Sequence, residues 1–361
     1  MKKLLLIYLV LFLFSACTQD GEKLVEAVPE KVDIVIENSV QGNGTPIIPI
    51  KEEPIPLNYQ IPSSSCISAL AHDHREFPDL ADKGIKFARP HPGPFSWEFI
   101  EETENEFDFS ETDKWVKAAQ KENIFLIATI FPYNEWDQIS CHGETECLVS
   151  SKDHFYSSTF NKGHSIPNHR CKPCSDKKYE NFLLKLVERY DGDGIDDMPG
   201  LELPILYYEI SNEPELDFEE LIFFKGSKQE FLDMTKLGYE TVKLACENCQ
   251  VLHGGAAGSE KTLEYWGELF EMGIGDYFDI ANIHFIGFGD KPTLNVAEYK
   301  KLLDENGIDK PIWVTEAELK KEDNYSKILE DSINTGAEKI FLVFIEILKE
   351  NEAEVLEDIC N

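Results

Sequence analysis

The chain has 361 residues, with 34 basic and 68 acidic side chains, and a formal net charge of −34 at pH 7. A field this negative repels polyanions, which excludes nucleic acid as a partner and makes acidic polysaccharides poor substrates unless a cleft is locally basic. We interpret most of these charges as solvated surface. Residues 63–361 are enough for one large barrel domain or for two smaller domains.

The N-terminus has the organisation of an export signal. Two lysines precede an apolar run at residues 4–14, which is too short to serve as a membrane-spanning helix. The small residues Ser15 and Ala16 then lead to Cys17, so residues 1–17 resemble the signal and lipobox of bacterial lipoproteins, although Phe14 is larger than the usual residue there. We expect acylation of Cys17 to anchor an exported protein to a membrane surface that faces the periplasm or the cell exterior. A plain secretory signal is the alternative.

Residues 18–62 form the next segment, which is rich in proline and acidic residues and has no sustained hydrophobic period. Proline at this density favours extended backbone over packed elements. We expect a tether that is disordered, followed by the catalytic domain at residues 63–361.

From residue 66 onward, short apolar runs alternate with amphipathic stretches. The predicted strands are 66–70, 85–89, 125–130, 205–210, 250–253, 280–284, 312–315 and 340–344. The predicted helices are 111–122, 179–190, 228–246, 262–272, 296–306 and 325–336, with a short last helix at 352–359. Strands that are apolar throughout are covered on both faces. Eight of them alternating with helices predict an α/β fold of the (β/α)₈ TIM-barrel class.

The loop after the third predicted strand, residues 131–178, is unusually long and carries four cysteines. With Cys17 set aside, eight cysteines remain, and an even number in an exported chain predicts disulfides. Close spacing favours the pairs 141–147, 171–174 and 246–249, which leaves Cys66 for Cys360. The alternative is a structural zinc site that uses the loop cysteines with His142 or His169.

A second possible metal site is the acidic turn at residues 191–197, Asp-Gly-Asp-Gly-Ile-Asp-Asp. Its oxygen ligands are dense, but Ile195 and Asp196 do not fit an EF-hand loop. A solvated acidic turn is the interpretation we favour, with calcium binding as the alternative, so no metal site is predicted.

Two glutamates carry the chemistry. Glu213 follows the fourth predicted strand in Asn212-Glu213-Pro214, and Glu316 follows the seventh in Trp313-Val314-Thr315-Glu316. Catalytic groups of such barrels come from the carboxyl ends of strands. Two carboxylates facing each other at about 5 Å are what hydrolysis of a glycosidic bond with retention requires.

With these motifs the sequence resembles the clan A glycoside hydrolases, which include cellulase-like, β-xylosidase-like and β-galactosidase-like enzymes. Residues 84–90, Gly-Ile-Lys-Phe-Ala-Arg-Pro, and Phe107-Asp108-Phe109 also match the group. The resemblance implies that Glu213 is the acid/base and Glu316 the nucleophile. It also implies that Asn212 bonds the sugar 2-hydroxyl and that Arg89 orients Glu316 and keeps it ionised.

Two positions depart from the pattern. The clan often has a tyrosine two residues after the histidine at the sixth strand, where this chain has Ile286 after His284. It usually has a tryptophan after the eighth strand, where this chain offers Phe344. These departures keep open a catalytically weak or inactive carbohydrate-binding lipoprotein as the alternative function.

Further substrate-binding candidates are His284, at a strand end, and His91, two residues beyond Arg89. Among aromatic residues that could stack on a sugar, Tyr133 and Trp136 are preferred over Trp97, Phe131 and Tyr208, because they lie just past the third strand. Glu209 and Glu215 are predicted to be hydrogen-bonded or solvated. We therefore expect a retaining hydrolase that acts on a neutral glycan and needs no cofactor.

Overall fold

The structure, a computed structural model, describes residues 59–62, 65–149, 165–217, 221–258, 260–285, 295–319, 324–345 and 360. The chain divides into two units, residues 1–52 and 53–361, and every described residue belongs to the second unit. The predicted signal, Cys17, most of the tether and the short helix at 352–359 lie outside the described residues.

In this described part, eight parallel strands form one sheet in the order β5-β4-β3-β2-β1-β8-β7-β6. The strands are β1 (Ile67–Ala71), β2 (Phe87–Pro90), β3 (Phe125–Ile130), β4 (Tyr207–Ile210), β5 (Gln250–His253), β6 (Ala281–Phe285), β7 (Ile312–Ala317) and β8 (Ala337–Leu342). Isolated parallel bridges join Leu252 to Ile280 and Ala256 to Ile283, between β5 and β6. The sheet is thus nearly closed, which confirms the predicted (β/α)₈ barrel.

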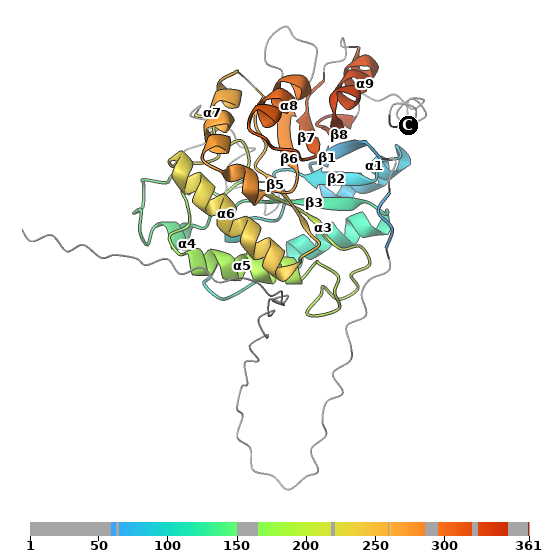
Figure 1. Ribbon diagram of the computed structural model, residues 1–361. Coiled ribbons are helices and arrows are strands. Elements are labelled where there is room, and N and C mark those ends of the chain that lie inside the picture. The colour runs from blue at the N-terminus through green and yellow to red at the C-terminus, as the bar shows by residue number, and fades with distance from the viewer. Residues whose placement is uncertain are drawn as a thin grey trace, which may run out of the picture. The chain divides into compact units, whose positions relative to one another are not determined.

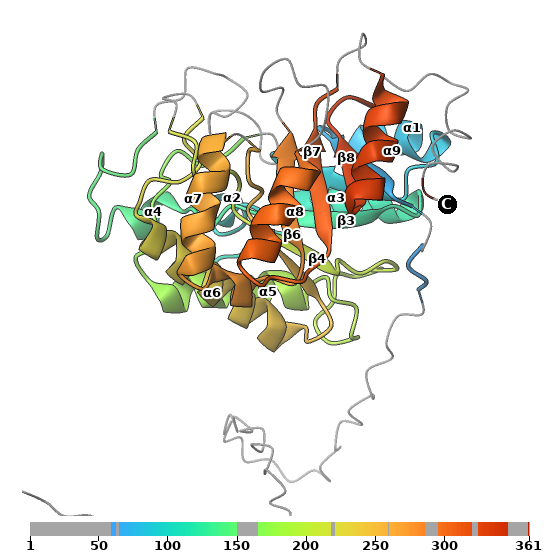
Figure 2. The same cartoon turned by 45° about the horizontal axis from the view of Figure 1, so that its top comes forward.

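Helices pack around the outside of the strands, with the later helices α7, α8 and α9 grouped beside β6, β7 and β8 (Figures 1 and 2). The α-helices are α1 (Phe77–Asp82), α2 (Trp97–Ile100), α3 (Ser110–Lys121), α4 (Glu135–Gln138), α5 (Asp176–Glu188), α6 (Lys228–Ala245), α7 (Glu260–Glu271), α8 (Val296–Glu305) and α9 (Tyr325–Thr335). Short 3₁₀ turns are η1 (His74–Glu76) and η3 (Ile274–Tyr277).

Local sequence accounts for the helix boundaries. Helix α5 begins three residues before the predicted start, because the Ser175 side chain accepts a hydrogen bond from the Lys178 amide and caps the first turn. Helix α6 begins at a capping box, in which Ser227 and Glu230 each bond the other's backbone amide. The buried face of α5 carries Phe182, Leu183 and Leu186, which confirms that these residues are core.

The barrel interior is layered. Because side chains alternate along a strand, Tyr207 and Glu209 both point inward from β4, as Phe87 and Arg89 do from β2. The lower layer is aromatic, with ring centroids 5.9 Å apart for Phe87–Tyr207 and 4.9 Å apart for Tyr207–Trp313. The next layer toward the carboxyl ends of the strands is polar. An apolar floor therefore supports a polar site at the mouth, as this architecture requires.

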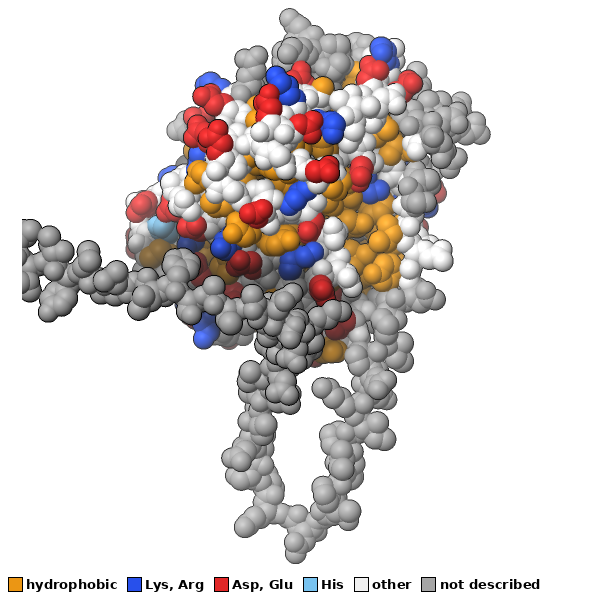
Figure 3. All heavy atoms as spheres, viewed as in Figure 1, with side chains coloured by type: hydrophobic (Ala, Val, Ile, Leu, Met, Phe, Trp, Pro, Cys, Tyr) orange, Lys and Arg blue, Asp and Glu red, His pale blue; other side chains and the backbone are white. Residues whose placement is uncertain are grey.

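The molecular surface carries charges of both signs. Figure 3 shows acidic and basic side chains interspersed over one face, with apolar side chains between them. This arrangement fits the interpretation of most charges as solvated surface. In the part of the chain that the structure describes, no helix combines the length and the apolar character needed to cross a membrane.

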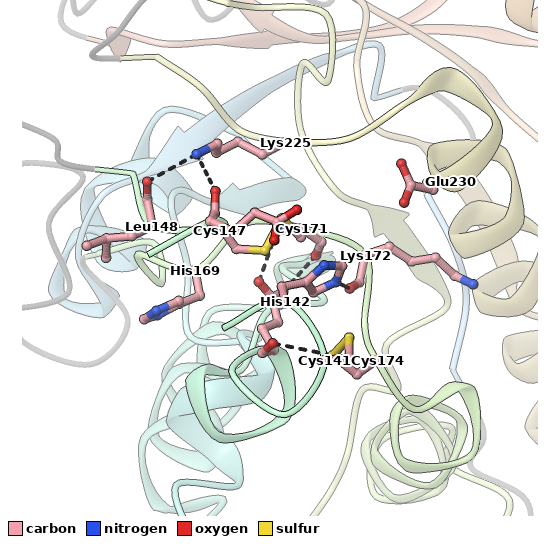
Figure 4. The surroundings of a disulfide bond; sticks show 12 residues. Cys141, His142, Cys147, Leu148, His169, Cys171, Lys172, Cys174, Lys225 and Glu230 are labelled. Atoms are coloured by element: carbon pink, nitrogen blue, oxygen red, sulfur yellow. Dashed lines mark hydrogen bonds between the residues drawn. A yellow bond between two sulfur atoms is a disulfide. The ribbon is translucent and has the colours of Figure 1, made fainter. Parts of the chain in front are cut away.

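The eight described cysteines form four disulfides, and two of the predicted pairings are wrong. Cys66–Cys360 and Cys246–Cys249 are present as predicted. The loop cysteines instead pair as Cys141–Cys174 and Cys147–Cys171, with His142 between the two bonds (Figure 4). An antiparallel bridge between Leu148 and His169 brings the two halves of the loop together, so each cysteine faces a partner across the loop.

This nested pairing also bears on zinc. A sulfur that is used in a disulfide does not supply the thiolate that zinc needs. The pairing therefore excludes the zinc alternative for the four loop cysteines.

Candidate active site

The polar layer of the barrel is centred on Arg89, which is fully buried on β2. All three nitrogens of its guanidinium donate hydrogen bonds. Nε donates to Glu209 Oε2 at 2.6 Å, Nη1 to Glu316 Oε1 at 2.6 Å, and Nη2 to Asn212 Oδ1 at 2.7 Å. A rigid fork of charge-assisted bonds fixes β2, β4 and β7 relative to one another at the barrel mouth.

Glu209 is the anchor of this layer. Besides Arg89, it accepts hydrogen bonds from Thr129, at 2.5 Å, and from Asn282, also at 2.5 Å, and Thr315 lies 3.1 Å from it. Burial alone would raise the pKa of Glu209, but the charge of Arg89 and hydrogen bonds from His284 and Thr129 hold it below its usual range. Glu209 is thus an ionised structural carboxylate, and the prediction that it is hydrogen-bonded is confirmed.

Glu316 is the carboxylate that β7 delivers to the mouth. It is 7% exposed, so it is the more open of the two predicted catalytic glutamates. Burial opposes its ionisation, but the charges of His284 and Arg89 and the hydrogen bond from Arg89 outweigh burial and lower the pKa of Glu316 to about 2. The side chain is therefore held as a carboxylate at any physiological pH.

Glu213 lies just after β4 on a strained stretch of backbone. Ser211 and Glu213 both have positive φ, at 71° and 35°, which is uncommon for residues with a side chain and concentrates at functional sites. The Glu213 side chain is 2% exposed. Burial is the largest influence on this group, and it raises the pKa of Glu213, with the neighbouring Glu316 charge acting in the same direction.

His284, from β6, lies between the two glutamates. Its Nδ1 is 2.9 Å from Glu213 Oε1 and 3.6 Å from Glu316 Oε1, while its Nε2 is 2.8 Å from Thr315 Oγ1. Burial would lower the pKa of His284, but the Glu316 charge and hydrogen bonds to Glu209 and Glu213 raise it to about 10. Both ring nitrogens then donate, and the side chain is an imidazolium.

The charges of the site balance in one protonation state. Arg89 and His284 are cations, and Glu209 and Glu316 are anions, which leaves Glu213 to be neutral. One oxygen each of Glu213 and Glu316 and a His284 nitrogen lie within 4.8 Å of one another. A metal ion at these three residues would have to displace the imidazolium proton and the Arg89 bond, so the arrangement favours two carboxyl groups in different protonation states over a metal centre.

His91 is also at the site, in the other charge state. Its Nδ1 lies 3.1 Å from Arg89 Nη1 and 3.6 Å from Glu316 Oε1. Because arginine only donates, Nδ1 must accept, and the imidazole is neutral. This agrees with burial, which lowers the pKa of His91 to about 4.

One glycine is required by this packing. A Cβ on Gly255, in the loop after β5, would lie 1.9 Å from His284 Nε2. The main-chain oxygen of Gly255 also accepts a hydrogen bond from the Glu213 amide at 3.2 Å. Gly255 thus gives His284 its space and holds the backbone of Glu213.

The aromatic predictions need correction. Tyr133 is fully buried, and its hydroxyl bonds the Phe223 carbonyl and lies 3.2 Å from Ser211 Oγ, so it offers no open face to a sugar. Trp97, Phe131 and Tyr208 are also fully buried. Tyr133 instead packs the strained turn that carries Glu213, and its position just after a strand did not reveal this burial.

Trp136 is only partly buried, on α4. Its indole nitrogen donates to the Glu101 carbonyl at 2.9 Å, and its ring lines a hollow of about 380 Å³ with Asn134 and Glu98. Burial raises the pKa of Glu98 to about 7. Trp136 thus remains the one preferred aromatic candidate that borders open space.

Three further residues were singled out in the sequence, namely Ile286, Phe344 and Glu215. Ile286, one of the two departures from the clan pattern, lies outside the described residues. Phe344 follows β8 and is 51% exposed. Glu215 is half-buried and accepts a hydrogen bond from the Ala257 amide at 2.7 Å, and burial raises its pKa to about 7, so it is hydrogen-bonded as predicted.

Sequence reasoning did not identify the residues that tie the site together: Thr129, Gly255, Asn282 and Thr315. Thr129, Gly255 and Thr315 lie at or near the carboxyl end of a predicted strand, which was the available signal, whereas Asn282 lies in the middle of one. Their residue types are too common at strand ends to single them out without the contacts.

Comparison with known proteins gives a consistent likeness. No protein-family model and no curated protein matches the chain. A glucosidase from Croceicoccus marinus is similar in structure, with a TM-score of 0.54 and 13% identity over 85% of this chain and 68% of the other. A xylanase, XynB from Paenibacillus barcinonensis, gives 0.50 and 14% over 78% and 84%.

A psychrophilic family 10 endo-β-1,4-xylanase gives a TM-score of 0.51 and 10% identity over 78% of this chain and 86% of that chain. At these identities the likeness is one of fold. The chain has the nearly closed (β/α)₈ barrel of these glycoside hydrolases, the group whose motifs its sequence resembles.

Proposed function

We propose that the protein is a retaining glycoside hydrolase that cleaves a neutral oligosaccharide or polysaccharide by double displacement. The observation that carries this proposal is the approach of Glu213 and Glu316 oxygens to within 4.8 Å. Retaining enzymes place their carboxyl groups about 5–5.5 Å apart, and inverting enzymes leave about 6.5–9.5 Å for a water molecule. The unequal pKa values of the two groups support the same mechanism.

The roles follow from protonation. Glu316, held ionised by Arg89 and His284, attacks the anomeric carbon and forms a glycosyl ester. Glu213, held neutral by burial, gives its proton to the departing oxygen. It then takes a proton from water, which cleaves the ester and restores Glu316. His284 assists both steps, because its Nδ1–H donates a hydrogen bond to Glu213 whether that carboxyl group is neutral or ionised.

Substrate binding completes the proposal. The Asn212 amide is oriented by Arg89, which bonds its oxygen. Its nitrogen donates to Glu213 Oε2 at 3.5 Å and has a second N–H to donate to a sugar hydroxyl. His91 and Trp136 are further candidates for glycan contacts. Export and an acyl anchor at Cys17 are proposed from the N-terminal sequence alone, together with a place at a membrane surface.

The test is a screen of the purified protein against aryl glycosides and neutral polysaccharides, with proton NMR of the first sugar released. We expect hydrolysis, and a first product with the anomeric configuration of the substrate. An inverted first product would contradict the mechanism. Glycan binding without turnover would favour the alternative, a carbohydrate-binding lipoprotein on a hydrolase barrel, which the residues Ile286 and Phe344 keep open.

The pH dependence of kcat/KM supplies a second prediction. Glu316 must be ionised and Glu213 protonated, so activity falls below pH 2, near the Glu316 pKa, and falls again above the raised Glu213 pKa. On the alkaline side the loss approaches tenfold per pH unit. The measurement is a pH–rate profile, for wild type and for Glu213→Gln, with an aryl glycoside whose leaving group departs faster with acid assistance and still departs slowly without it.

The variant has no acid to lose a proton, so its alkaline decline should disappear. If the decline persists unchanged in Glu213→Gln, another group causes it and the acid/base assignment fails. A Glu338→Gln variant, at an exposed position of β8, serves as the control and should keep the wild-type profile.

A further inference from the structure

A second cluster of carboxylates lies at the opposite end of the barrel from Glu213. Asp191, Asp193 and Asp197 belong to the loop that connects α5 to β4, so they lie where β4 begins, and the active site lies where it ends. One carboxylate oxygen from each lies within 4.8 Å of the others. Oxygen ligands on opposite sides of a calcium ion are separated by about 4.6–5.2 Å, so the three oxygens fit within one coordination sphere.

The negative charge of this cluster is not compensated. In the described ranges, no lysine, arginine or histidine pairs with Asp191, Asp193 or Asp197. Asp191 is only 9% exposed. Carboxylates this close to one another, one of them buried, repel each other unless a cation lies among them.

An independent observation comes from Tyr208, the second residue of β4. Its neighbours Tyr207 and Glu209 point into the barrel, so Tyr208 points outward, toward the helices. The side chain is fully buried, and its hydroxyl has no hydrogen-bond partner. Asp191 is the charged group that acts on it most strongly, and Asp197 acts on it too. A buried phenol next to carboxylates that it does not bond leaves a polar position for a ligand or for a ligand's water.

Backbone amides of the loop donate hydrogen bonds to the aspartate carboxylates. The Asp197 oxygens accept from the Gly192 and Gly194 amides at 3.1 and 2.8 Å, and Asp193 accepts from the Ile195 amide at 2.7 Å. These bonds hold the Asp193 and Asp197 carboxylates in fixed orientations. Asp191, Asp193 and Asp197 then supply three carboxylate ligands, and water completes the six to eight that calcium takes.

We propose that the loop of Asp191, Asp193 and Asp197, with Tyr208 beside it, is a calcium site. Magnesium suits it less, because magnesium keeps several waters and demands a strict octahedron. The site is structural: the Ile205 amide donates to the Tyr190 carbonyl at 2.8 Å, so an ion here fixes the segment through which α5 feeds β4. This inference does not depend on the proposed function.

The test is isothermal titration calorimetry of the full chain with its disulfides intact. The protein is first stripped of metal with EGTA, the EGTA is removed, and CaCl₂ or, separately, MgCl₂ is titrated in. We expect one calcium per chain with a Kd on the order of 0.1–1 mM or lower, and a weaker response to magnesium. Thermal unfolding in excess calcium should occur at least about 4 °C above unfolding in EGTA. No saturable calcium binding by the wild-type protein would overturn the proposal, and this result does not require any variant to fold.

Variants locate the ion. Asp193→Asn and Asp197→Asn should each weaken calcium binding at least about tenfold. Asp304→Asn, an exposed aspartate on α8, should bind as the wild type does. Tyr208→Phe reports the hydroxyl and should weaken binding by a smaller factor. Wild-type affinity in Asp193→Asn and Asp197→Asn would show that the ion binds elsewhere and would overturn the assignment.

Discussion

Replacing the proposed nucleophile, Glu316→Gln, is expected to lower kcat/KM for an aryl glycoside by on the order of 10⁴-fold. Glutamine has the same shape, and its amide oxygen can still accept the hydrogen bond from Arg89. It cannot form the glycosyl ester. The loss should therefore appear in turnover, with the far-ultraviolet circular dichroism and the unfolding midpoint close to those of the wild type.

Chemical rescue makes this prediction specific. Glu316→Ala removes the carboxylate and leaves space beside Arg89, so added azide should enter and attack the anomeric carbon directly. The single displacement should yield a glycosyl azide of inverted configuration and restore a large part of the lost rate. Glu338→Gln, which replaces an exposed glutamate on β8, should behave as the wild type. Activity of Glu316→Gln within about tenfold of the wild type would mean that another group is the nucleophile.

Strands β3 and β5 were predictable from the sequence because they are buried on both faces. The apolar runs at 125–130 and 250–253 match β3 and β5 at both ends. Strand β8 was misplaced because polar residues interrupt its apolar run. It begins at Ala337, and the Lys339 ammonium lies 4.0 Å from the centroid of the Phe87 ring, inside the barrel floor. A charged residue inside a barrel is invisible to a hydrophobic pattern.

The active site, like the fold, has features that the sequence predicts and features that it does not. A motif at each of two strand ends was enough to single out Glu213 and Glu316, because such positions converge in any barrel. The resemblance also implied that Arg89 keeps Glu316 ionised, but the charge of His284 was not predictable, because it depends on groups from several strands at once. His284 is an imidazolium only because Glu213, Glu316 and Glu209 surround it. The predicted pairing of the loop cysteines was wrong for a related reason. Closeness in sequence does not determine which cysteines face each other across a loop.

Removing the central cation, Arg89→Leu, should be the most destabilising single change in the polar layer. It leaves Glu209, fully buried, and Glu316 without the guanidinium that bonds both. Breaking a buried ion pair by removing one partner costs about 3–5 kcal/mol. Urea unfolding followed by intrinsic fluorescence at pH 7 measures this cost. The control is Arg75→Leu, because Arg75 makes a similar two-nitrogen contact with Asp73 at the surface, and little change is expected there.

The pH dependence separates this electrostatic cost from lost packing. In the wild type, Arg89 holds the pKa of Glu209 below its usual range, so the pair stabilises the fold above the ordinary carboxyl pKa and loses this contribution only as pH falls through the lowered value. In Arg89→Leu, burial acts unopposed by the guanidinium, and the Glu209 pKa rises. Protonation at pH 4 then relieves the buried charge. The deficit relative to the wild type should therefore be smaller at pH 4 than at pH 7. A deficit that is equal at both values would trace the loss to packing and would remove Arg89 as the electrostatic anchor of the site.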